Sequence, residues 1–136
     1  MALSETDTIE VEKQADALRR QGWASFVTFE HLLGSWRRLC SEIAGYAATI
    51  DDYTNDLSSR KGLELIRAAS DPVVAQRLAA ELLYWDERFR EVTDPDESAL
   101  VGDFYRLTDE SGWWYRRIPK TGPLREYLDS WSRERE

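Results

Sequence analysis

The apolar residues between positions 26 and 57 recur at alternating intervals of three and four, which is the spacing of one face of an α-helix. This face consists of Phe26, Phe29, Leu33, Trp36, Cys40, Ile43, Ala47, Ile50 and Leu57. A second apolar row lies beside it: Leu32, Leu39, Tyr46 and Tyr53. Together the two rows are wider than a two-stranded coiled coil needs. The pattern predicts one long central helix over about 24–57 that packs against other helices on more than one side.

A second helix start is marked by Asp71 and Pro72. An acidic side chain at the N-cap accepts hydrogen bonds from free N–H groups, and proline suits the first helical position. Apolar residues spaced by three and four follow, so we predict a helix over 72–92. Ser58, Ser59 and Gly62 interrupt the first apolar pattern, so a separate shorter helix is predicted near 59–69. Further short helices are predicted near 96–107 and 123–132, and an irregular arm rich in Trp and Arg at 111–122. Segment 1–21 is highly polar and has two interpretations, a frayed tail or a docking helix. The predicted class is an all-α, single-domain helical bundle.

The overall charge and hydropathy disfavour several classes of partner. The chain has 18 basic and 26 acidic residues, a formal net charge of -8. Nonspecific binding to phosphate backbones depends on Lys and Arg, so nucleic-acid binding is disfavoured. We expect no membrane span, because there is no apolar run of about 18 residues. The amino end is acidic where a signal peptide needs basic residues, so we expect a cytoplasmic protein.

The single cysteine and the single histidine do not predict a reactive centre. Cys40 belongs to the apolar row, where a thiol behaves as a small buried hydrophobe. His31 falls on the opposite side of the helix, and one isolated imidazole forms neither a metal cluster nor a triad. The sequence contains no phosphate-binding glycine loop and no G-x-S-x-G motif. No catalytic residue, metal ligand or cofactor is predicted.

Carboxylates at helical spacing require a separate interpretation. Asp52 and Asp56 share one helix face, which points away from the apolar rows, so we expect both to be solvated. In the later helix, Asp86 is placed to pair with Arg90 on an exposed face. An alternative function uses carboxylates for metal or ligand binding, or for enzymatic chemistry. Its candidate residues are Glu30, Glu42, Asp51 and Asp56, with Tyr46 or Tyr53 nearby.

Negative charge concentrates between positions 86 and 110, where nine acidic residues and three arginines give a net charge of -6. Such a concentration can steer a basic partner toward one face. The residues predicted to do so are Asp94, Asp96, Glu97, Asp103, Asp109 and Glu110. A soluble helix-loop-helix with capping carboxylates is the structural alternative.

The arm that follows has the opposite character, with no acidic residue between 111 and 125. Its prominent side chains are those of Trp113, Trp114, Arg116 and Arg117. Two interpretations are open. The arm packs over the bundle while its arginines reach the acidic stretch, or it contributes to a binding surface, where Trp, Tyr and Arg are enriched.

These observations favour a small acidic non-catalytic binding protein that acts through a protein partner with a basic surface. Inhibitors, immunity proteins, antitoxins and chaperones, including small bacterial ones, are of this kind, although fold class does not determine function. The wide apolar stripe also suggests a further alternative, self-association, in which two long helices meet in a homodimer.

Overall fold

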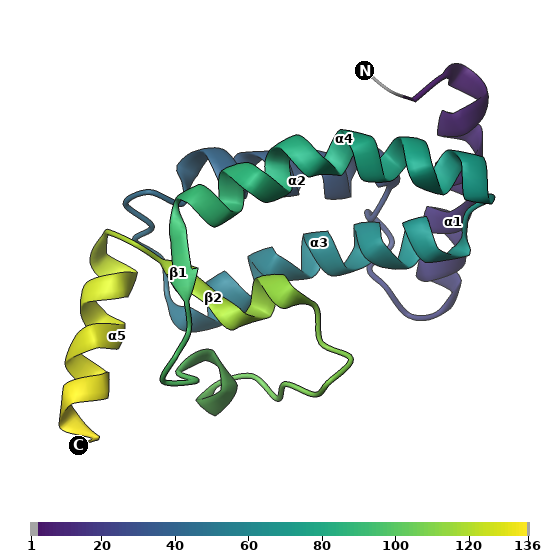
Figure 1. The fold of residues 1–136 in the computed structure, drawn as a ribbon. Coiled ribbons are helices and arrows are strands. Elements are labelled where there is room, and N and C mark those ends of the chain that lie inside the picture. The colour runs from purple at the N-terminus through teal and green to yellow at the C-terminus, as the bar shows by residue number, and fades with distance from the viewer. Residues whose placement is uncertain (1–2, 136) are drawn as a thin grey trace.

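The chain folds mainly into helices, as a computed structural model of residues 3–135 shows (Figure 1). The α-helices in this range are α1 (Glu5–Arg20), α2 (Phe29–Glu42), α3 (Ile50–Ala69), α4 (Pro72–Glu91) and α5 (Pro123–Glu134). Short elements are the strands β1 (Thr93–Pro95) and β2 (Arg117–Pro119) and the 3₁₀ turns η1 (Val101–Asp103) and η2 (Trp113–Arg116). The predicted all-α helical bundle is therefore confirmed.

Helices α2, α3 and α4 form the body of the bundle, and each packs against the other two. Helix α1 crosses one end of this body and α5 stands at the opposite end (Figure 1). The core contains large side chains from all three central helices. Those that are almost completely buried include Trp36, Tyr53, Leu57, Leu63, Leu78, Leu82 and Phe89. The rings of Trp36 and Phe89 lie 4.9 Å apart and join α2 to α4.

The prediction of one helix over about 24–57 is wrong. Helix α2 ends at Glu42, residues 43–49 form a loop, and α3 begins at Ile50. Gly45 adopts a φ of 86°, which permits the chain to reverse, and Thr49 and Asp52 form a capping box that starts α3. The apolar spacing continued across the break because Ile43 and Tyr46 are buried within the loop.

Helix α3 also continues where the sequence predicted an interruption. Ser58, Ser59 and Gly62 lie inside it, so the predicted helix 59–69 is its second half. Gly62 is a site of close approach, because an added Cβ would lie 2.9 Å from Leu32 Cδ1 of α2. The restart after α3 matches the prediction, since the Asp71 side chain accepts a hydrogen bond from the N–H of Val73 at the start of α4.

Of the two interpretations of the amino-terminal segment, a frayed tail or a docking helix, the structure shows the docking helix. Val11, Ala15 and Leu18 of α1 are buried against the bundle. A capping box between Ser4 and Asp7 starts the helix, and Arg77 of α4 donates a hydrogen bond to Asp7 at 2.9 Å. Residues 1 and 2, which fall within the predicted segment, lie outside the described range.

The predicted helix over 96–107 is wrong, because only the turn η1 forms there. The Asp96 carboxylate accepts hydrogen bonds from the N–H groups of Leu100 and Val101, which closes a loop, and Ala99 has a φ of 52°, outside the right-handed helical region. The arm at 111–122 contains a strand that the sequence did not predict. Strand β2 pairs antiparallel with β1, with Ile118 opposite Asp94. Helix α5 forms where 123–132 was predicted.

A buried polar network joins the three central helices. Asp86 of α4 accepts hydrogen bonds from Trp36 Nε1 at 3.1 Å and from Arg60 Nε and Nη2 at 2.9 Å each. Arg60 and Asp86 are only 5% and 7% exposed. The interpretation of Asp86 as a surface partner of Arg90 is wrong, because helix α4 turns Asp86 into the core. The Arg90 guanidinium instead lies 3.8 Å from the centre of the Trp113 ring.

Candidate functional site

The acidic residues predicted to face a partner are divided between internal contacts and solvent. Asp94 accepts a hydrogen bond from Arg125 at 2.9 Å, Asp103 pairs with Arg135 at 2.6 Å, and Asp96 caps the loop described above. The remaining three are exposed, and the described residues offer them no ion pair: Glu97, Asp109 and Glu110. Part of the predicted steering charge is thus neutralised by arginines near the carboxyl end of the chain.

The tryptophans of the arm pack against the bundle. Trp114 is 4% exposed, and the Arg60 guanidinium lies 4.7 Å from its ring centre. Trp113 is half-buried beside Phe89 of α4. Arg117 donates hydrogen bonds to the Thr93 hydroxyl and to backbone carbonyls, and Arg116 donates to the Thr108 carbonyl. Within residues 3–135 neither arginine forms an ion pair with the acidic stretch.

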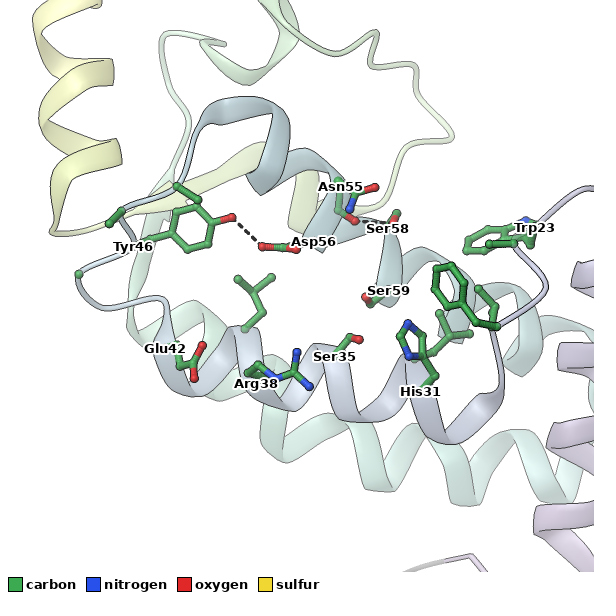
Figure 2. A pocket seen from close by; sticks show the side chains of 18 residues that line it. Trp23, His31, Ser35, Arg38, Glu42, Tyr46, Asn55, Asp56, Ser58 and Ser59 are labelled. Carbon is green, nitrogen blue, oxygen red and sulfur yellow. Dashed lines mark hydrogen bonds between the residues drawn. The ribbon is translucent and has the colours of Figure 1, made fainter.

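The principal concave site lies elsewhere, in a groove between α2 and α3 with a volume of about 640 Å³ (Figure 2). We call it the α2/α3 groove. Its α2 wall presents residues three or four positions apart, and its α3 wall presents a polar cluster. The polar lining residues are His31, Ser35, Arg38 and Glu42 from α2, with Asn55, Asp56, Ser58 and Ser59 from α3. Trp23 lines one end and Tyr46 lines the other (Figure 2). Phe26 also lines the groove, with its ring centre 5.1 Å from that of His31.

The groove exists because small side chains face each other where large ones would fill the space. Ser35 on α2 and Ser58 and Ser59 on α3 line it, and all three side chains are short. Helix α3 tolerates these serines, since the Ser58 hydroxyl donates a hydrogen bond to the Asn55 carbonyl of its own helix. The residues that suggested a helix break therefore produce a concave surface.

Asp56 is held in a defined position within the groove. The Tyr46 hydroxyl donates a hydrogen bond to Asp56 Oδ2 at 2.6 Å (Figure 2). Burial and this hydrogen bond raise the pKa of Tyr46, so the phenol stays protonated and remains a donor at neutral pH. The prediction that Asp52 and Asp56 are both fully solvated holds for Asp52 only, because Asp56 is half-buried.

Several polar groups in the groove have no partner among the described residues. Ser59 is 8% exposed, and its hydroxyl, which points into the groove, forms no hydrogen bond within residues 3–135 (Figure 2). Arg38 and Glu42 are exposed on the α2 wall one helical turn apart, and neither forms an ion pair within residues 3–135. His31 is exposed, and its ring packs edge-on against Phe26 at 5.1 Å. These groups can donate hydrogen bonds to a bound molecule and accept hydrogen bonds from it.

The carboxylates of the metal-site alternative are not gathered in one place. Glu42 and Asp56 line the groove, whereas Glu30 and Asp51 are exposed outside it. In the part of the chain that the structure describes, no three His, Cys, Asp or Glu side chains are grouped closely enough to hold a metal ion. Cys40 is buried as predicted, and its burial raises the pKa of the thiol.

Comparison with known proteins adds no further assignment. No known protein family, no curated protein and no solved structure matches the chain. Among residues 3–135, every helix is too short or too polar to cross a lipid bilayer. The α2/α3 groove, which the sequence reasoning missed, is therefore interpreted from its own chemistry.

Proposed function

We propose that the chain is a small acidic non-catalytic binding protein that acts through a protein partner, and that the α2/α3 groove receives an extended segment of that partner. The observation that carries the proposal is a groove of about 640 Å³ whose walls hold both hydrogen-bond donors and hydrogen-bond acceptors that are free to bind a ligand. Arg38 can only donate hydrogen bonds, Asp56 can accept them, and Ser59 can do both.

The dimensions of the groove fit a short stretch of extended chain. His31 and Glu42 lie eleven positions apart on α2, which corresponds to about 16 Å at a rise of about 1.5 Å per residue. An extended peptide advances about 3.3 Å per residue, so about five residues span this length. Its N–H and C=O groups alternate, and the mixed donors and acceptors of the two walls complement that alternation.

The acidic segment has a supporting role in this proposal. Glu97, Asp109 and Glu110 remain exposed, and the chain carries a net charge of -8, so a basic partner is attracted before it docks. Reversing these three charges should slow association and flatten its salt dependence. Trp114 is too deeply buried to contact a partner, so replacing it would alter stability before binding.

The proposed function is tested by selecting linear heptapeptides from a displayed library against the purified protein. Binding of the selected peptides is then compared in two variants of α2. Ser35→Phe places a ring in the groove, whereas the control Ser41→Phe adds the same ring at an exposed position outside it. We expect Ser35→Phe to abolish binding and Ser41→Phe to preserve it. Equal binding by both variants, or no selected peptide, would refute the proposal.

Self-association is the second candidate, and it now rests on a different helix. The apolar face of α2 is buried within the bundle, whereas Val73, Leu83 and Tyr84 of α4 are more than half exposed. A homodimer through α4 would cover them. Light scattering at micromolar concentration tests this candidate, and a monomeric mass would exclude an obligate dimer. For either candidate we propose a cytoplasmic location.

A further inference from the structure

We infer that the segment bound in the α2/α3 groove carries an arginine or lysine side chain, which Asp56 and Glu42 bind where α2 ends. This inference rests on the proposed function and names the chemistry of the partner. Three features support it: the electrostatics of the α2 carboxyl end, the uncompensated charge of Asp56, and the free hydroxyl of Ser59.

The first feature is an acidic residue where a helix favours a basic one. The carboxyl end of a helix carries partial negative charge, which Lys, Arg or His normally offsets. Helix α2 has no basic residue in its last turn and ends in Glu42. Glu42 adds negative charge to a helix end that is already negative, and such departures from local preference are expected at functional sites. A bound cation would remove the conflict.

The second feature is the position of Asp56. One oxygen of this half-buried carboxylate is fixed by Tyr46, and no cation among residues 3–135 pairs with either oxygen. Arg60 lies one turn further along α3, but it is already bound to Asp86 and Glu64. The charge of Asp56 therefore faces the groove without compensation, and a charge-assisted hydrogen bond from a ligand would compensate it.

The third feature is independent of charge. Ser59 lies three positions after Asp56, so both side chains project from the same face of α3. The Ser59 residue is 8% exposed, and its hydroxyl, which forms no hydrogen bond within the described residues, points into the groove (Figure 2). A guanidinium has five N–H donors in a fixed plane, more than one carboxylate accepts. Asp56 and Ser59 together offer acceptors for such a group.

The opposite end of the groove limits where the basic side chain can lie. Arg38 gives the middle of the α2 wall a positive charge, which disfavours a cation there. Beyond it, Trp23 lines the other end, and Phe26, whose ring packs against His31, is 67% exposed. This end fits an apolar side chain. The bound segment is expected to have a basic residue about five positions from an apolar one, since five extended residues cover the groove length of about 16 Å.

The test compares heptapeptides selected by the wild-type protein, by Asp56→Asn and by Asp51→Asn. Both substitutions remove one charge from α3, but Asp51 is exposed and lies outside the groove. We expect Arg or Lys to be enriched at one position by the wild type and by Asp51→Asn, and the enrichment to disappear in Asp56→Asn. Replacing that arginine by neutral citrulline in a synthetic peptide should weaken binding to the wild type at least about tenfold.

The outcomes separate this inference from the proposed function. Peptides that Ser35→Phe excludes, but that show no basic enrichment, would overturn the inference and leave the proposed function in place. Enrichment that persists in Asp56→Asn would overturn it as well. If no selected peptide is sensitive to Ser35→Phe, both the inference and the proposed function are refuted. Glu42→Gln provides a second variant on an exposed residue whose loss does not threaten folding, and it should reduce the citrulline effect in the same direction.

Discussion

Removing the carboxylate of Asp86 should destabilise the protein far more than removing any surface charge. In Asp86→Ala, Arg60 would remain 5% exposed in the core and would keep only the more exposed Glu64, at 3.3 Å, as a counter-ion, and Trp36 Nε1 would lose its acceptor. Leaving one member of a buried ion pair unpaired costs about 3–5 kcal/mol. For a chain of 136 residues this corresponds to a fall in Tm of about 10–17 °C.

The assay is urea unfolding followed by far-ultraviolet circular dichroism and by tryptophan fluorescence. The control is Glu91→Ala, because Glu91 forms a long, exposed ion pair with Arg88 at 4.0 Å. We expect the control to lose less than about 1 kcal/mol. A double variant, Arg60→Met with Asp86→Leu, should be more stable than Asp86→Ala alone, because it removes both buried charges.

The result distinguishes the buried network from an exposed ion pair between Asp86 and Arg90. An exposed i,i+4 pair contributes about 0.3–0.5 kcal/mol, so the two arrangements differ roughly tenfold in the expected loss. A loss for Asp86→Ala no greater than that of Glu91→Ala would refute the reasoning. The same conclusion would follow if the double variant were less stable than Asp86→Ala.

Three further predictions concern stability, reactivity and pH. Gly34→Ala should raise the unfolding free energy by about 0.5–1 kcal/mol, because its site is open, whereas Gly122→Ala should lower it, because φ is 103° and an added Cβ would lie 2.6 Å from backbone atoms; urea curves decide both. Cys40 should react with a thiol reagent only after unfolding, since burial raises its pKa, and rapid labelling of the native protein would contradict this. The backbone hydrogen bond from Ser4 lowers the pKa of Asp7 below the usual 3.8, so its stabilisation is present above that pH and is lost as pH falls through the lowered value. The Tm difference between wild type and Asp7→Asn should therefore shrink in acid, and a constant difference would count against it.

The sequence predicted which residues are buried better than it predicted where each helix begins and ends. The three-and-four spacing correctly identified Phe29, Leu33 and Trp36 as core residues. It could not reveal the loop between α2 and α3, because Ile43 and Tyr46 keep the same spacing while the chain reverses. Two local signals were nevertheless present, a glycine at 45 and the capping pattern that begins at Thr49.

The candidate site was beyond prediction for a different reason. A groove depends on which faces of two helices meet, and the spacing within each helix does not determine that. His31 was correctly expected to be exposed, and its spacing of seven positions from Arg38 puts both on one helix face, yet nothing in the sequence places that face opposite Ser59. The prediction that the acidic segment is free to face a partner failed for a similar reason. Part of its charge is neutralised by Arg125 and Arg135, which lie in or just after a helix that the sequence does not position.

The core register of α3 continues through the interruption predicted at 58–62, and it also explains the buried network. Tyr53, Leu57, Arg60, Leu63 and Ile66 are spaced by three and four and are all buried, so the core register of α3 is unbroken. The break was predicted from Ser58, Ser59 and Gly62, which do not disturb this register. One of the core positions, however, holds arginine, a residue that is almost never fully buried unless it is paired. An arginine at a core position of an otherwise continuous helix therefore requires a buried acceptor on another element, and in this bundle that acceptor is the carboxylate on α4.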